Sequence, residues 1–62
     1  MKRKDFIKFL NNNNCLIIRE GAKHSIFKNN FNEFKAAVPR HSELKYNTCK
    51  EICKQLEIKS PF

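Results

Sequence analysis

Two histidines are the residues of this sequence best suited to acid–base chemistry. His24 stands between two lysines, Lys23 and Lys28, and His41 follows a proline-containing segment later in the chain. An imidazole gains and loses a proton near neutral pH, so a histidine can act as general base and as general acid. The neighbouring lysines would hold a phosphate and stabilise charge in a transition state. We therefore predict His24 as the catalytic candidate and His41 as either a second acid–base group or a structural residue; the alternative for His24 is a purely structural surface position.

Basic residues are the second feature of the sequence that indicates chemistry. The formal charge is +7, with seven Lys/Arg against two acids in residues 1–30 and six against four in residues 31–62. This balance favours a polyanionic partner, nucleic acid first, although a lysine-rich solvated surface would give the same composition. The predicted RNA-contacting residues lie in or beside the central β-rich part of the chain: Arg19, Lys23, Lys28, Lys35 and Arg40.

The three cysteines, Cys15, Cys49 and Cys53, are an odd set and cannot all pair within the chain. No apolar leader is recognisable at the start, so we expect reduced thiols and a cytoplasmic protein. Cys49 and Cys53 lack the tight Cys-x-x-Cys spacing of zinc sites and lie on an apolar stripe, which favours buried free thiols over ligands. We predict no metal and no cofactor. No stretch approaches the roughly 18 apolar residues that a membrane-spanning helix needs.

Hydrophobic periodicity divides the chain into five elements. A helix is expected over residues 4–12, with Asn14 in the left-handed conformation that closes it. The run 15–19 suits a strand covered on both faces, 24–28 a second strand and 34–38 a third. Between the first two strands, Gly21 is expected to supply a positive φ.

The second helix carries the apolar stripe Cys49, Ile52, Cys53 and Leu56. Thr48 and Glu51 fit a capping box at its start, while an earlier start near Leu44 stays open. Short connections make the sheet antiparallel, with both helices on one face. The prediction is one α+β domain, residues 1–62, of order α-β-β-β-α, as in a double-stranded-RNA-binding domain.

Most of the chain, roughly residues 2–58, resembles the HicA toxin family. The resemblance lies in four segments: Phe6–Leu10, Arg19–Phe27, Val38–Leu44 and Ile52–Ile58. It implies the fold predicted above, activity as a ribosome-independent mRNA interferase (an endoribonuclease) and neutralisation by an antitoxin of the HicB family. In a type II toxin–antitoxin system of this kind, the toxin needs no metal when the ribose 2′-hydroxyl is the nucleophile.

The family's catalytic histidine belongs to a Gly-Ser-His motif that opens the second strand. Here the region reads Gly21-Ala22-Lys23-His24, with Ala22 in place of serine and one additional residue in the turn. With the longer turn His24 takes the catalytic place and Phe27 the place of the aromatic that follows; without it Lys23 would stand there. A non-catalytic RNA- or partner-binding module of the same fold is the alternative. A DNA-binding helix is disfavoured, because no second helix precedes Cys49 at helix-turn-helix spacing.

Overall fold

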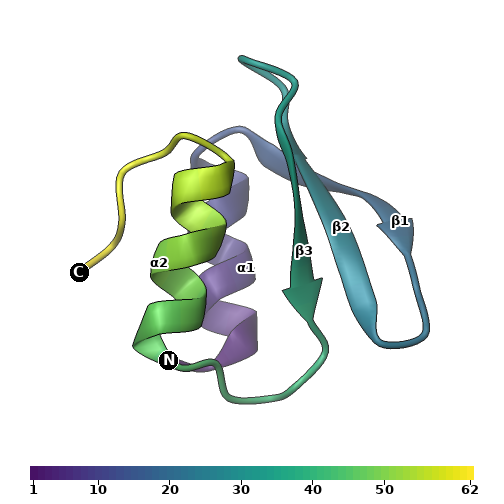
Figure 1. The fold of residues 1–62 in the computed structure, drawn as a ribbon, viewed down its shortest axis with the longest axis vertical. Coiled ribbons are helices and arrows are strands. Elements are labelled where there is room, and N and C mark those ends of the chain that lie inside the picture. Colours follow the sequence, from purple (N-terminus) through teal and green to yellow (C-terminus); the bar gives the residue numbers. More distant parts are fainter.

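The computed structural model describes all 62 residues and has the predicted α+β architecture (Figure 1). The elements are α1 (Arg3–Asn12), β1 (Cys15–Glu20), β2 (His24–Asn29), β3 (Lys35–Pro39) and α2 (Tyr46–Gln55). The three strands form one antiparallel sheet in the order β1-β2-β3, and both helices cover the same face of it. The predicted order and class are confirmed. The structure contains no helix that is long and apolar enough to cross a membrane.

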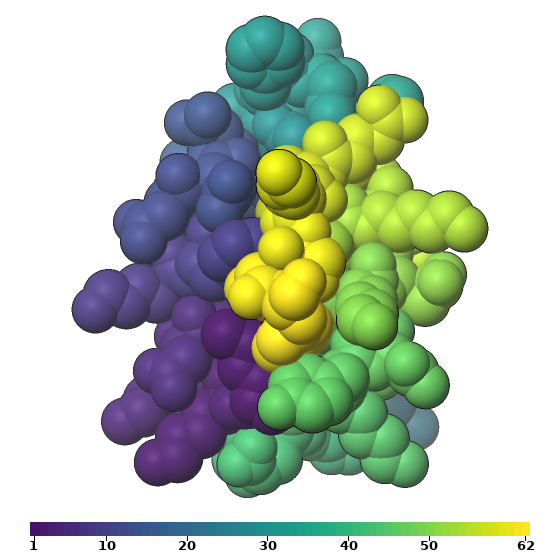
Figure 2. Space-filling view, turned by 90° about the vertical axis from the view of Figure 1, so that its left-hand side faces the viewer, coloured from purple at the N-terminus to yellow at the C-terminus, as the bar shows by residue number.

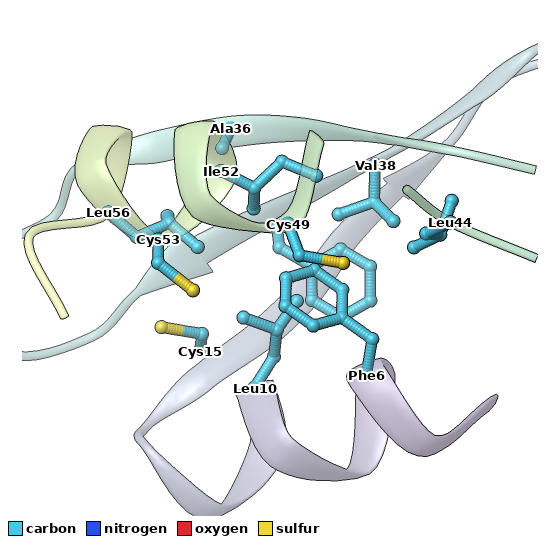
Figure 3. Close-up of a cluster of buried hydrophobic side chains, with 11 residues drawn as sticks. Phe6, Leu10, Cys15, Ala36, Val38, Leu44, Cys49, Ile52, Cys53 and Leu56 are labelled. Atoms are coloured by element: carbon cyan, nitrogen blue, oxygen red, sulfur yellow. The ribbon is translucent and has the colours of Figure 1, made fainter. Parts of the chain in front are cut away.

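The core lies between the helices and the sheet (Figure 3). Phe6 and Leu10 of α1 are fully buried, as the helical spacing predicts, and Phe27 of β2 meets them from the sheet. The rest of the core comes from the two edge strands β1 and β3, the loop before α2 and the predicted stripe of α2: Cys15, Ala36, Val38, Leu44, Cys49, Ile52, Cys53 and Leu56. A chain of this length buries a limited area, so each of these side chains matters for stability.

The first strand is an edge strand, and the prediction that both its faces are covered is wrong. Only Cys15 is buried in β1, whereas Leu16, Ile17 and Ile18 are 44–50% exposed. A register shift between Ile17 and Arg19 interrupts the pairing with β2. Such a bulge twists an edge strand and hinders pairing with further chains. A run of apolar residues cannot reveal whether a strand lies at the centre or at the edge of its sheet.

The capping box predicted at Thr48 and Glu51 does not form, because α2 begins earlier. Lys45 is the N-terminal cap, without a side-chain hydrogen bond, and Cys49 N–H donates to the Lys45 carbonyl at 3.0 Å. Thr48 therefore lies inside the helix. The start is fixed by tertiary contact instead: Leu44 is buried, and its N–H donates to the Met1 carbonyl at 2.8 Å.

Asn14 closes the α1–β1 connection as predicted, with φ of 64°. Gly21, in contrast, has no positive φ, so the reason given for this glycine is wrong. It is needed for space: a Cβ atom there would lie 2.8 Å from the backbone oxygen of His24. That is closer than real Cβ atoms approach backbone oxygen, so the turn between β1 and β2 requires glycine at this position.

The C-terminal tail lies over the helical side of the molecule (Figure 2). Figure 2 shows this tail between α1 and α2, and Ile58 packs against the core. At its end Phe62 meets Tyr46 edge to face, with ring centroids 4.4 Å apart. The sheet face opposite the helices has no such cover (Figure 1).

Candidate acid–base site

The two histidines line one open hollow at the end of the sheet where β2 begins and β3 ends. This hollow, called the histidine hollow below, has a volume of about 410 Å³. Its walls come from the β1–β2 turn and from the loop after β3, and all four ionisable side chains in it are exposed. The lining residues are Ala22, Lys23, His24, Pro39, Arg40 and His41.

Two further hollows adjoin the histidine hollow and share residues with it. One, of about 400 Å³, runs along β3 and α2, where His24 is joined by Thr48 and Glu51. The other, of about 610 Å³, contains His41 together with Glu43 and Lys45. Each histidine thus has a carboxylate-bearing residue in a neighbouring hollow. Together they form a concave surface open to solvent on which a flexible polymer has room to lie.

His24 opens β2, the strand position at which the sequence predicts the acid–base candidate. Its carbonyl accepts a hydrogen bond of 2.8 Å from the Gly21 N–H, and His24 pairs with Pro39 of β3. Lys23 lies in the turn, where its carbonyl accepts from Arg40 N–H at 3.2 Å. The turn therefore places an exposed imidazole at position 24 at the start of the strand.

A network of charged and polar groups holds this turn in place. The hydroxyl of Ser25, which is fully buried, donates to Glu20 Oε1 at 2.6 Å. The same oxygen accepts from Arg40 Nη1 at 2.8 Å, and Arg40 also donates to the Gly21 carbonyl at 3.1 Å. Glu20 thereby connects the end of β1, the start of β2 and the loop after β3. Ser25, next to His24, and Arg40 of the opposite loop are thus bound to one carboxylate.

Arg3 of α1 fixes both walls of the histidine hollow from behind. Its Nη2 donates to Ser25 Oγ at 2.8 Å, next to His24, and its Nε donates to the Pro39 carbonyl at 2.9 Å. Its backbone N–H donates to the Ser42 carbonyl at 2.8 Å, just beyond His41. A single arginine from the first helix therefore joins the histidine-bearing strand to the histidine-bearing loop.

The structure separates the five predicted RNA-contacting residues into two groups. Lys23 and Arg40 lie in the histidine hollow, although the Arg40 guanidinium is paired with Glu20. Lys28 and Lys35 face each other across β2 and β3, four residues along β2 from His24 and hence about 13 Å away at roughly 3.3 Å per residue. They are not part of the hollow.

The remaining basic candidate is Arg19 of β1, which pairs with Ile26 of β2 and so lies one strand further from β3. Residues of β2 alternate, with Ser25, Phe27 and Asn29 buried toward the helices. Lys28 and Ile26, and therefore Arg19, belong to the opposite, uncovered face of the sheet. The uncovered face thus carries positive charge on all three strands.

The cysteines are free, and all three are buried in the core. Burial raises the pKa of the Cys15 and Cys49 thiols, and burial together with the two neighbouring thiols raises the pKa of Cys53 to about 11. In Figure 3 the sulfur atoms of Cys15 and Cys53 point toward each other. A raised pKa keeps these groups as neutral thiols rather than nucleophilic thiolates. No three His, Cys, Asp or Glu side chains are grouped as metal ligands.

Arg3, Ser25 and Glu20 shape the site but were not among the residues predicted from the sequence. One signal was available for Ser25, because it is a polar residue on the alternating buried side of a strand that also carries Phe27. Buried polar groups require partners, so a charged neighbour was to be expected. Nothing local indicated that this neighbour is Arg3, 22 residues away.

The model of the family described as "HicA toxin of bacterial toxin-antitoxin" matches residues 3–58 of the chain. No match to the chain was found among curated proteins or among solved structures. The matched range runs from the first residue of α1 to beyond the end of α2, so it includes all five elements and the histidine hollow. This chain belongs to the HicA family of bacterial toxins.

Proposed function

We propose that the chain is an endoribonuclease toxin that cleaves mRNA with His24 as its acid–base group and without a metal ion. The observation that carries this proposal is the histidine hollow itself. It brings His24, His41 and Lys23 from two separate segments into one solvent-open concavity. Family membership gives the chain a toxin role, with RNA as the family's general target and an antitoxin as its partner.

The proposed reaction is attack of a ribose 2′-hydroxyl on the adjacent phosphorus. An imidazole removes the 2′-hydroxyl proton, the bond from phosphorus to the 5′-oxygen breaks, and that oxygen receives a proton. The products are a 2′,3′-cyclic phosphate and a 5′-hydroxyl end. His24 acts as one of the two groups. His41, which lines the same hollow, is the candidate for the other, with a purely structural role as its alternative.

Positive charge next to the reacting phosphate would stabilise the pentacoordinate transition state, in which negative charge accumulates on the phosphoryl oxygens. Lys23 is exposed in the hollow, and no acidic side chain is paired with it. The Arg40 guanidinium is ion-paired with Glu20, so we assign Arg40 a structural role in the hollow and no contact with phosphate. Lys23 is therefore the better candidate for the group that binds the scissile phosphate.

We further propose a HicB-type antitoxin as the partner that neutralises the toxin in the cytoplasm. The hollow is open and its walls are rich in basic residues, so an acidic protein that covers it would block access of RNA. Copurification with a small acidic protein is the expected result when the two are expressed together.

A cleavage assay on a defined single-stranded RNA tests the enzymatic proposal. His24→Ala should abolish cleavage while circular dichroism and the melting temperature stay close to those of the wild type, because the side chain is exposed. His41→Ala tests the second group: loss of cleavage with an unchanged fold assigns it the second proton transfer, and retention of cleavage assigns it a structural role. EDTA should leave the rate unchanged, and the 3′ product should carry a cyclic phosphate. Full cleavage by His24→Ala would refute the catalytic role and leave an RNA-binding module.

A further inference from the structure

The turn between β2 and β3 presents the most exposed large apolar side chain of the protein. Phe31 is 86% exposed, more than any other large hydrophobic residue. Its ring makes no aromatic pair within the chain, unlike Tyr46 and Phe62, which cover each other. In Figures 1 and 2 this turn projects beyond the ends of the helices, at the end of the sheet opposite the histidine hollow.

The turn is not a loose loop, because side-chain hydrogen bonds fix its backbone. Asn29 is buried, and its Oδ1 accepts from the Phe31 N–H at 2.9 Å while its Nδ2 donates to the Leu56 carbonyl at 2.8 Å. Asn32 donates to the same carbonyl at 3.1 Å and accepts from the Phe34 N–H at 2.8 Å. The end of α2 thereby anchors the turn. The fold holds the Phe31 backbone in one position, so a ligand that binds the ring does not have to order it first.

Positive charge lies at the base of the same turn. Lys28 and Lys35 are directly opposite each other in the last ladder position of β2 and β3. Lys28 makes one ion pair, 3.7 Å from a carboxylate oxygen of Glu33; the Lys28 side chain is 29% exposed and that of Glu33 79%. Because the carboxylate lies mostly in solvent, the ion pair is weak and does not prevent a phosphate from binding. No acid is paired with Lys35.

We propose that Phe31 is a stacking platform for an unpaired base of single-stranded RNA, with the phosphates of the neighbouring nucleotides on Lys28 and Lys35. Sequence-tolerant binding of single strands combines these two features, an exposed aromatic face and a basic track along the backbone. This inference rests on the proposed function, because it takes the same RNA that reaches His24. It adds a second subsite at the other end of the sheet.

The spacing fits a short single strand. Asn29 is the last residue of β2, where the turn that carries Phe31 begins. It lies five residues after His24, which corresponds to about 16 Å at roughly 3.3 Å per residue. A segment of about four nucleotides, the short end of the range for single-strand binding sites, would join the two subsites. Between the two subsites the RNA would cross the uncovered sheet face, where Ile26 of β2 and Ala37 of β3 offer apolar surface.

Binding of an eight-nucleotide RNA, measured by fluorescence anisotropy in the non-cleaving His24→Ala background, tests the proposal. Stacking contributes about 1–3 kcal/mol per base, so Phe31→Ala should weaken binding roughly 5- to 150-fold. Phe31→Leu should lose most of the affinity and Phe31→Trp should restore it, with indole fluorescence quenched by the RNA. Phe62→Ala, which removes another exposed aromatic, is the matched control and should bind normally.

An RNA series with one abasic nucleotide locates the contact. At one position the abasic RNA should bind wild type and Phe31→Ala equally, because the base that stacks is missing. Equal affinity of Phe31→Ala and wild type for intact RNA overturns the stacking site and leaves the proposed function standing. Absence of binding by every variant, wild type at position 31 included, counts against the proposed function itself. If Phe31→Ala weakens only the complex with the antitoxin, the ring belongs to a protein interface and the proposal is wrong.

Discussion

Replacement of Ser25 by alanine tests whether the buried hydroxyl holds the site together. Ser25 is completely buried, accepts a 2.8 Å hydrogen bond from Arg3 and donates a 2.6 Å bond to Glu20. A hydrogen bond to a charged group contributes about 1.5–3 kcal/mol, and the partly exposed partners recover some of this from water. We therefore expect Ser25→Ala to lower the free energy of unfolding by about 2 kcal/mol.

That loss is large for so short a chain. At about 0.05–0.15 kcal/mol per residue, the total stability of a 62-residue domain is roughly 3–9 kcal/mol. For a domain of this size each kcal/mol shifts the melting temperature by about 4–8 °C, so Ser25→Ala should melt roughly 8–16 °C lower. Urea unfolding followed by circular dichroism gives the free energy directly, and thermal melts give the second measure.

The control for this substitution is Ser42→Ala. Ser42 is exposed and its hydroxyl makes no intramolecular hydrogen bond, so its removal should change stability by no more than about 0.5 kcal/mol. The rate of RNA cleavage, measured at a temperature where both variants are folded, adds a functional measure. Ser25 has no proposed contact with the RNA, but it fixes the strand that carries His24. A Ser25→Ala protein that melts within about 2 °C of wild type and cleaves at its rate would refute the role of this network.

Three further predictions concern the turn, the thiols and the charge. Gly21→Ala should lower the free energy of unfolding by about 1–3 kcal/mol and reduce cleavage, because its Cβ would lie 2.8 Å from the His24 backbone oxygen. Ala22→Ser is the control and should leave the stability in urea unchanged. Equal stability of the two variants would contradict this prediction. The pKa of Cys53 is raised to about 11 in the folded protein, so the contribution of the neutral thiol to stability is fully present below about pH 9 and is lost as the pH rises toward 11. The difference in urea midpoint between wild type and Cys53→Ala should therefore shrink over that range. The affinity for single-stranded RNA should fall with salt, and Lys23→Ala should reduce the slope of log K against log salt by about 0.7, the value expected for one phosphate contact; an unchanged slope would remove Lys23 from the phosphate site.

Local sequence patterns determined the elements and most of the core. The stripes of α1 and α2 follow from side-chain spacing alone, because residues three and four apart share one helix face whatever the rest of the chain does. Asn14 was predicted in the left-handed conformation for the same local reason, the intrinsic backbone preference of asparagine. The family was also recognisable from residues in the order and spacing of the chain, and the family match confirms it.

Tertiary structure alone decided which strand is an edge and where α2 begins. The apolar run of β1 is compatible with a central strand, and only the order β1-β2-β3 leaves it exposed. Likewise Thr48 and Glu51 carry a valid local capping signal, but the pairing of Leu44 with Met1 and the burial of Leu44 start the helix sooner. At the start of α2 a long-range contact outweighs a local capping preference of about 1 kcal/mol.

The candidate site shows the same division. Sequence alone pointed to His24 and His41 as residues with the right chemistry, but 17 positions of chain separate them and no spacing rule brings them together. The antiparallel pairing of β2 with β3 and the hydrogen bonds of Arg3 to Ser25, Pro39 and Ser42 place both in one hollow. Chemical identity is a property of each residue and is written in the sequence. The approach of two distant side chains is a property of the paired strands and the helix that anchors them, and it exists only after the chain has folded.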